Sequence, residues 1–215
     1  MRSLRGESPL PVRREDLRRK VRARTRKALV VFAVDASDSM ATHERLRIAK
    51  GAALALLRSA YLRRDRVAVV VFEGEASRVL LAPTQSVELA RSRLRKLPIG
   101  GATPLAAGMM AAWDLIRTER LREPLTSPTL VLLSDGRANV PLDPGADPRM
   151  EVLGIADQMR ADGIGAVLVD AGSLGPTPGQ LEELAARLGG TLVRVGPGGA
   201  GTVLAACSRV WHRAT

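Results

Sequence analysis

One short segment of the chain carries oxygen-bearing side chains at a spacing suited to binding a hard cation. Asp35, Ser37 and Ser39 come directly after the apolar run that begins at Leu29. An apolar run of this length predicts a buried strand. Residues just beyond the carboxyl end of a parallel strand lie in the crevice where open α/β sheets bind ligands. We therefore expect the three side chains to meet at a functional edge of a sheet.

Two other loops are expected to reach the same edge. Thr103 closes an irregular, glycine-rich segment, and Asp135 follows the apolar run at residues 129 to 134. With the first segment they offer two carboxylates and three hydroxyl groups. Mg²⁺ favours all-oxygen coordination with one or two carboxylates and several retained waters. The donor set therefore predicts a magnesium site, with Mn²⁺ as the alternative ion, that keeps a position open for an outside carboxylate.

Apolar runs alternate along the chain with longer segments of helical period, which indicates an α/β fold. We predict a Rossmann-like three-layer sandwich, in which a mostly parallel six-stranded sheet has helices on both faces. A short turn at residues 73 to 76 would make the third strand an antiparallel edge strand. The predicted strands are residues 29–35, 66–73, 77–81, 129–134, 164–170 and 190–195.

Six helices are expected to cover this sheet. Their ranges are residues 42–62, 86–96, 104–119, 149–162, 178–188 and a last helix from about residue 200. Pro104 suits the first turn of the third of these helices, because proline loses no intrahelical hydrogen bond there. Thr103 would then be its N-cap residue, a role that is compatible with metal ligation.

The composition sets limits on the class of protein. A chain of 215 residues with 46% hydrophobic content suits one domain. No stretch approaches the roughly 18 to 20 apolar residues of a membrane span, and no secretory signal is recognisable. We therefore expect a cytoplasmic protein without a membrane span. The single cysteine, Cys207, excludes a disulfide within the chain.

The positive charge is concentrated at the start of the chain. Residues 1 to 28 hold eleven Lys and Arg against three acidic residues, a net charge of +8 out of the total of +11. We expect residues 1–27 to be a basic, flexible tail and residues 28–215 to be the folded domain. The tail would be a linker or would dock on an acidic surface. Nucleic acid is the less favoured partner, because no aromatic residues that could stack on bases are interleaved with the arginines.

The motifs resemble a metal-ion-dependent adhesion site, and the chain from about residue 28 onward resembles the von Willebrand factor A (VWA) domain family. Within that family it is similar to the carboxyl-terminal domain of the D subunit of magnesium chelatase. The similarity is carried by residues 29–40, 100–105 and 130–139. The resemblance implies that Ser37, Ser39 and Thr103 contribute hydroxyl oxygens, while Asp35 and Asp135 act largely through water or hydrogen bonds.

Asp38 departs from the family pattern, which usually has glycine between the two serines. We expect its side chain to face solvent or to cap the following helix. D subunits normally also place an AAA+ module before this domain. The chain contains no Gly-x-x-x-x-Gly-Lys-[Ser/Thr] motif, so ATP hydrolysis is expected to come from a partner.

The resemblance implies a non-catalytic binding domain, a D-like component of an ATP-dependent chelatase that inserts magnesium or cobalt into a tetrapyrrole. Its partners would be a chelatase I-like AAA+ ATPase, which supplies an acidic ligand to the metal, and a larger chelatase subunit. An alternative is a co-chaperone of a MoxR-type AAA+ ATPase in metalloenzyme maturation. A hydrolase or phosphotransferase that uses Asp35 directly ranks well below both.

Overall fold

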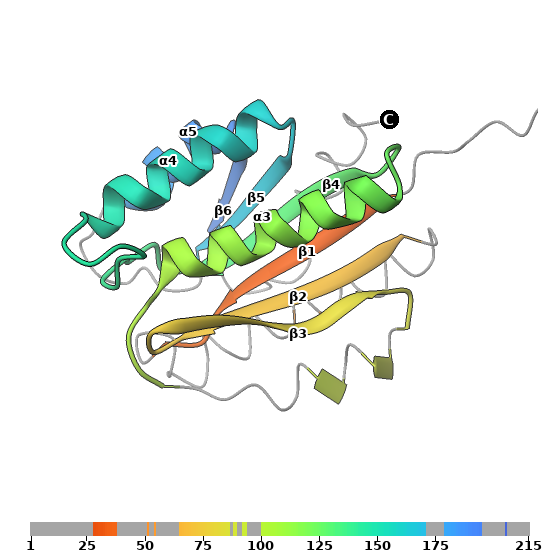
Figure 1. Ribbon diagram of the computed structural model, residues 1–215, viewed down its shortest axis with the longest axis horizontal. Coiled ribbons are helices and arrows are strands. Elements are labelled where there is room, and N and C mark those ends of the chain that lie inside the picture. The colour runs from red at the N-terminus through yellow and green to blue at the C-terminus, as the bar shows by residue number, and fades with distance from the viewer. Residues whose placement is uncertain are drawn as a thin grey trace, which may run out of the picture.

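The computed structural model describes the central sheet and three of the helices around it (Figure 1). The described residues are 28–37, 51, 54, 65–86, 88–89, 92–93, 100–170, 179–194 and 205. The described part of the chain contains the loop that follows the fourth strand and the first two residues, Ala36 and Ser37, after the first strand. The expected tail at residues 1–27 lies outside it.

Six strands form one mixed sheet in the order β3-β2-β1-β4-β5-β6, and all neighbours are parallel except the β2–β3 pair. This confirms the predicted sheet with its antiparallel edge strand. The strands are β1 (Ala28–Asp35), β2 (Arg66–Glu73), β3 (Ala76–Thr84), β4 (Ser127–Ser134), β5 (Gly165–Asp170) and β6 (Thr191–Arg194).

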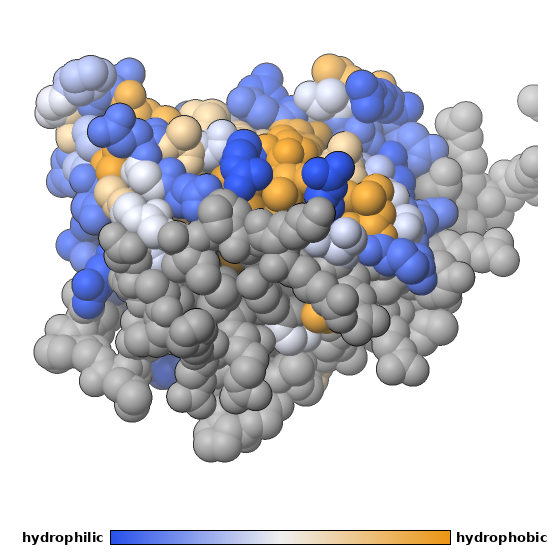
Figure 2. Space-filling model, turned by 90° about the horizontal axis from the view of Figure 1, so that it is seen from below, coloured by the Kyte–Doolittle hydropathy of each residue, from blue (hydrophilic) through white to orange (hydrophobic). Residues whose placement is uncertain are grey.

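The edge strand β3 is longer than predicted, because it continues through Pro83 to pair with β2 as far as Thr84. Proline is tolerated on an edge strand, where its missing N–H need not serve a second neighbour. Seen from the side of β3, the described surface mixes hydrophobic groups with hydrophilic ones (Figure 2). Proline and charged side chains such as Arg78 also discourage pairing of an exposed edge with another chain.

Three helices are described along most of their length, at positions close to those predicted. They are α3 (Leu105–Arg122), α4 (Pro148–Ala161) and α5 (Gln180–Leu188). The predicted helices at residues 42–62, at 86–96 and from 200 onward lie outside the described residues, apart from a few isolated helical positions.

The predicted start of α3 is wrong in one respect. Pro104 itself is the N-cap residue, its carbonyl accepts a hydrogen bond from the Gly108 amide at 3.0 Å, and no side chain caps the helix. Thr103 is the residue before the N-cap. Its carbonyl accepts the Leu105 amide at 2.9 Å, a hydrogen bond that precedes those of the helix. Its hydroxyl group is therefore not engaged by the helix terminus.

A large core lies between the sheet and the described helices, and it includes Trp113. Alternate residues of β1 (Leu29, Val31 and Ala33) point into it, together with buried residues of α3, α4 and α5. The residues between them on β1 are also buried. Burial on both faces explains why parallel strands appear in the sequence as continuous apolar runs.

The strand order changes direction between β1 and β4. From β1 the chain continues to β2 and β3 on one side, and from β4 it continues to β5 and β6 on the other. Such a switch point opens a crevice at the carboxyl ends of the two strands, because their following loops lead in opposite directions. Val34 pairs with Leu133 there, so Asp35 and Ser134 are adjacent at that edge.

Close packing of α3 on β2 depends on a glycine. A Cβ atom at Gly108 would lie 2.6 Å from Cγ of Phe72, inside the contact distance of the ring. We predict that Gly108→Ala lowers the free energy of unfolding by about 1–3 kcal/mol, because overpacking a buried site outweighs the better helix propensity of alanine. Urea denaturation would measure the change.

Gly154 in α4 provides the matched control. It is exposed, and a Cβ atom there would meet nothing within 4 Å. Gly154→Ala should raise the free energy of unfolding by about 0.5–1 kcal/mol. A stabilising effect of both substitutions would show that α3 does not depend on contact with Phe72.

Candidate metal site

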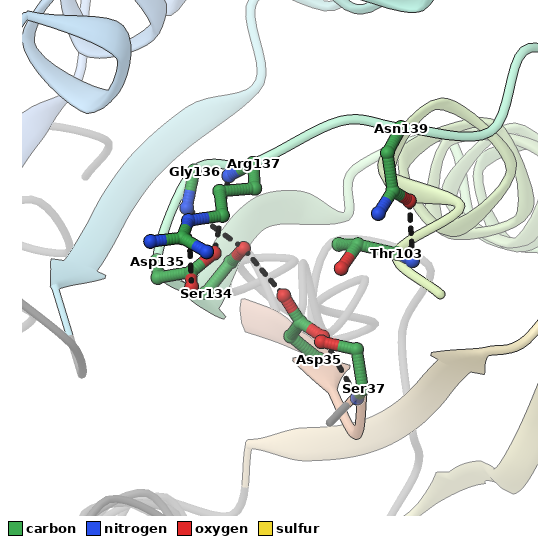
Figure 3. Close-up of polar contacts among 8 residues, drawn as sticks. All are labelled: Asp35, Ser37, Thr103, Ser134, Asp135, Gly136, Arg137 and Asn139. Atoms are coloured by element: carbon green, nitrogen blue, oxygen red, sulfur yellow. Dashed lines mark hydrogen bonds and ion pairs between the residues drawn. The ribbon is translucent and has the colours of Figure 1, made fainter. Parts of the chain in front are cut away.

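Asp35 ends β1 and is completely buried, with 0% of its surface exposed. Its carboxylate is fixed from two sides. Oδ1 accepts the Ser37 amide at 3.0 Å, and Oδ2 accepts the Ser134 hydroxyl at 2.7 Å (Figure 3). The position of the carboxylate is therefore set by the loop that follows its own strand and by the neighbouring strand.

Ser134 is a residue of the site that the sequence analysis missed. Besides donating to Asp35, its hydroxyl oxygen accepts the Gly136 amide at 3.0 Å. Gly136 has a positive φ of 82°, a conformation that glycine adopts without the steric penalty of a side chain. A serine at the end of an apolar strand was a usable signal, but its role appears only when β4 is known to lie beside β1.

Burial raises the pKa of Asp35 above its ordinary value, because the folded environment removes water from the charged form. Hydrogen bonds from Ser37 and Ser134 oppose this effect, and the negative charge of Asp135 adds to it. The ionised carboxylate is therefore held in a place where negative charge is disfavoured. A bound cation would relieve this cost, since an opposite charge nearby favours the ionised form.

Thr103 is buried, with 2% of its surface exposed, and its backbone is held by Asn139. The backbone amide of Thr103 donates to the side-chain oxygen Oδ1 of Asn139 at 2.7 Å. The backbone amide of Asn139 donates in return to the Thr103 carbonyl at 3.3 Å. Figure 3 shows the Thr103 hydroxyl without a hydrogen bond to the other labelled residues. Asn139 lies in one of the stretches that carry the family resemblance, but the sequence suggested no role for it.

The loop before Thr103 is attached to the ends of β1 and β2. The Gly100 amide donates to the Ala36 carbonyl at 2.8 Å, and the Gly74 amide donates to the Ala102 carbonyl at 3.0 Å. At Gly101, where φ is 87°, a Cβ atom would lie 2.9 Å from Cα of Gly74. Glycine is needed at Gly101 both for its backbone conformation and for this close approach. The glycine-rich composition therefore serves to bring Thr103 to the edge of the sheet.

Asp135 follows β4 and faces the same edge. Its Oδ1 accepts the Arg137 amide at 3.1 Å, and its Oδ2 lies 3.6 Å from Nε of Arg137. Its side chain is only 7% exposed. The two carboxylates of the edge thus come from adjacent strands.

Four of the five residues expected to bind the metal lie at this edge: Asp35, Ser37, Thr103 and Asp135 (Figure 3). The fifth, Ser39, and its neighbour Asp38 lie outside the described residues. Among the residues that the structure describes, no group of three or more His, Cys, Asp or Glu could hold a metal ion. A cation at this edge would therefore depend on hydroxyl oxygens beside the two carboxylates, which is the donor chemistry expected from the sequence.

Comparison with known proteins agrees with the fold and the motifs. The family described as "von Willebrand factor type A domain" matches residues 30–137. That match covers half of the chain, and the chain belongs to this family.

Two relatives show which members of the family this chain resembles in sequence. The magnesium-chelatase 67 kDa subunit of Chlorobaculum tepidum is 40% identical over 172 residues, which are 75% of this chain and 27% of that protein. The uncharacterized protein Rv2850c of Mycobacterium tuberculosis is 41% identical over 190 residues, 88% of this chain and 30% of that protein. The chain thus spans less than a third of the length of these two relatives.

A solved structure shares the fold at low sequence identity. The manganese-loaded TRAP protein of Plasmodium vivax superposes with a TM-score of 0.63 at 15% identity, covering 86% of this chain and 73% of the other. No helix in the described part of our protein has the length and apolar character needed to cross a membrane.

We predict that Ser134→Ala destabilises the protein by about 1–3 kcal/mol. The substitution removes a hydrogen bond to a buried carboxylate and leaves the Gly136 amide without its acceptor. Ser127→Ala, at the other end of β4, is the control and should change the free energy of unfolding by less than about 0.5 kcal/mol. Equal effects in urea denaturation would contradict a special role of the Ser134 hydroxyl.

Proposed function

We propose that the domain binds a partner protein through a divalent cation, Mg²⁺ or Mn²⁺, at the edge formed by β1 and β4. The residues proposed to hold the ion are Asp35, Ser37, Ser39, Thr103 and Asp135. The observation that carries the proposal is the buried Asp35 carboxylate, which Ser37 and Ser134 orient in a place that disfavours its charge. When bound, the ion would supply a positive charge with a coordination position that a carboxylate oxygen of the partner can take.

The residues of this chain prepare the site before a partner arrives. Ser134 and the Ser37 amide hold the Asp35 carboxylate in one orientation, so little conformational entropy is lost when a ligand binds. Asn139 holds the backbone of Thr103 and leaves the threonine hydroxyl directed at the edge. A rigid site of this kind favours binding through a few well-placed contacts.

The identity of the partner is proposed from the relatives. The similarity to the magnesium-chelatase 67 kDa subunit supports a D-like component of an ATP-dependent chelatase that inserts magnesium or cobalt into a tetrapyrrole. In this proposal an AAA+ ATPase subunit hydrolyses ATP and presents an acidic side chain to the domain. The cation bound by the domain joins two proteins and is distinct from the ion that is inserted. The domain itself acts in binding and does not catalyse the insertion.

The role of the Thr103 hydroxyl can be tested without removing a charge. Mg²⁺ at about 100 times its Kd should stabilise the wild-type domain by about 2.7 kcal/mol relative to EDTA. Thr103→Val, which replaces the oxygen with a methyl group, should lose most of this stabilisation, whereas Thr103→Ser should keep it. Thermal unfolding with and without Mg²⁺ measures the difference. The same Mg²⁺-dependent shift in the valine variant would remove Thr103 from the ligand set.

Partner binding is tested with purified domain and a cell extract, with Mg²⁺ and with EDTA, followed by mass spectrometry of the proteins that differ. We expect an AAA+ chelatase subunit only with Mg²⁺, and we expect Asp35→Ala to lose it while circular dichroism shows a folded domain. Asp157→Ala is the control, since Asp157 is exposed and paired with Arg187 on the helical surface. Recovery of a MoxR-type ATPase would move the function to metalloenzyme maturation. Unchanged partner binding by Asp35→Ala would refute the proposed site.

A further inference from the structure

An exposed arginine lies beside one carboxylate of the proposed metal site. Arg137 is two residues beyond Asp135, and 59% of its side chain is exposed, whereas the Asp135 side chain is only 7% exposed. Figure 3 shows the two side chains facing each other beside Ser134. Arg137 is thus a solvent-exposed cation next to the carboxylate of a proposed metal ligand.

The contact between Arg137 and Asp135 is loose. Nε of Arg137 lies 3.6 Å from Oδ2 of Asp135, which is beyond hydrogen-bond distance. In several other pairs of the structure the guanidinium donates at close range, as from Arg187 to Asp157 at 2.7 Å. Among the described residues the Arg137 guanidinium has this ion pair with Asp135 but donates no hydrogen bond. Within the described part of the chain its N–H donors are therefore available to another acceptor.

The position of the arginine makes it complementary to an incoming acid. Two carboxylates, those of Asp35 and Asp135, already lie at the edge of the sheet. They would repel a third carboxylate unless positive charge is added. The proposed cation supplies part of this charge, and a guanidinium beside it can bind the second oxygen of the same carboxylate in the planar, forked geometry that arginine favours.

We propose that Arg137 is a binding residue of the docking site and hydrogen-bonds the acidic side chain that the partner places on the metal. The inference rests on the metal-dependent docking proposed above, and it specifies the ligand as a carboxylate bound at two points. One oxygen meets the cation and the other meets Arg137. Lysine would not replace the arginine fully, because an ammonium group keeps the charge but not the fork.

A neighbouring arginine provides the matched control. Arg149 lies in the first turn of α4. Its side chain is 55% exposed, close to the exposure of Arg137, but it already donates to Glu183 of α5. Removing Arg149 therefore takes away the same charge without taking away an available donor near Asp135. A general effect of positive charge would appear in both variants, whereas direct binding of the ligand would appear only at Arg137.

The experiment uses glutarate as a simple carboxylate probe, titrated into the domain at saturating Mg²⁺ and followed by NMR chemical shifts. Arg137→Ala should raise the Kd for glutarate by about tenfold or more, as expected for loss of a hydrogen bond between charged groups. Arg137→Lys should lie between wild type and alanine, and Arg149→Ala should stay within about twofold of wild type. Mg²⁺ binding itself, measured by calorimetry without glutarate, should persist in all three variants.

The outcomes separate this inference from the proposed function. If the wild type binds Mg²⁺ and glutarate but Arg137→Ala binds glutarate equally well, the role of Arg137 is refuted while the metal site stands. Equal weakening by Arg137→Ala and Arg149→Ala would also refute it, because the effect would then be one of overall charge. Loss of Mg²⁺ binding in Arg137→Ala would show a structural role instead. If the wild type binds no Mg²⁺, the proposed metal site fails and the inference fails with it.

Discussion

The hydrogen bond from Ser134 to Asp35 joins the two central strands at the point where the strand order changes direction. β1 and β4 lie side by side there, and the chain leaves them toward opposite edges of the sheet. A buried carboxylate at such a place is costly unless hydrogen bonds or an opposite charge compensate it. Ser134 and the Ser37 amide supply the hydrogen bonds. The pKa of Asp35 is nevertheless raised, so positive charge from the proposed cation would stabilise the ionised carboxylate further.

The other loops of the site are positioned by the same edge. The glycine-rich loop is attached through backbone hydrogen bonds to the ends of β1 and β2, and Gly101 permits an approach to Gly74 that a side chain would prevent. Asn139 then ties the loop after β4 to Thr103. Each of these contacts joins segments far apart in the sequence. Strand ends and the hydrogen bonds between their loops therefore hold the polar groups in place, which suits a site that recognises a partner by a few directed contacts.

The charges at the edge have an order that follows from burial. Asp35 is deepest and its pKa is raised, Asp135 is nearly buried, and Arg137 is exposed. Of the three charged groups, the guanidinium is thus the one most accessible to a partner, and both carboxylates are largely shielded from solvent. Positive charge from the guanidinium and from the proposed cation would offset the repulsion between these carboxylates and the acidic side chain of a partner. It also distinguishes Arg137 from Arg149, whose charge is already paired with Glu183.

The sequence by itself determined the strand pattern and the residues proposed for the metal site. Long apolar runs identified parallel strands because such strands are buried on both faces, and residues just after them were expected at one edge of the sheet.

Local patterns failed where the deciding contact joins distant segments. Thr103 resembled a helix cap, yet it is held by Asn139 from another loop. Ser134 looked like the end of a strand, although it orients Asp35. The close fit of Gly108 to Phe72 likewise had no local signal. Only the tertiary structure decided these roles, because a hydrogen bond or a packing contact between distant residues exists only after the strands and helices have been brought together.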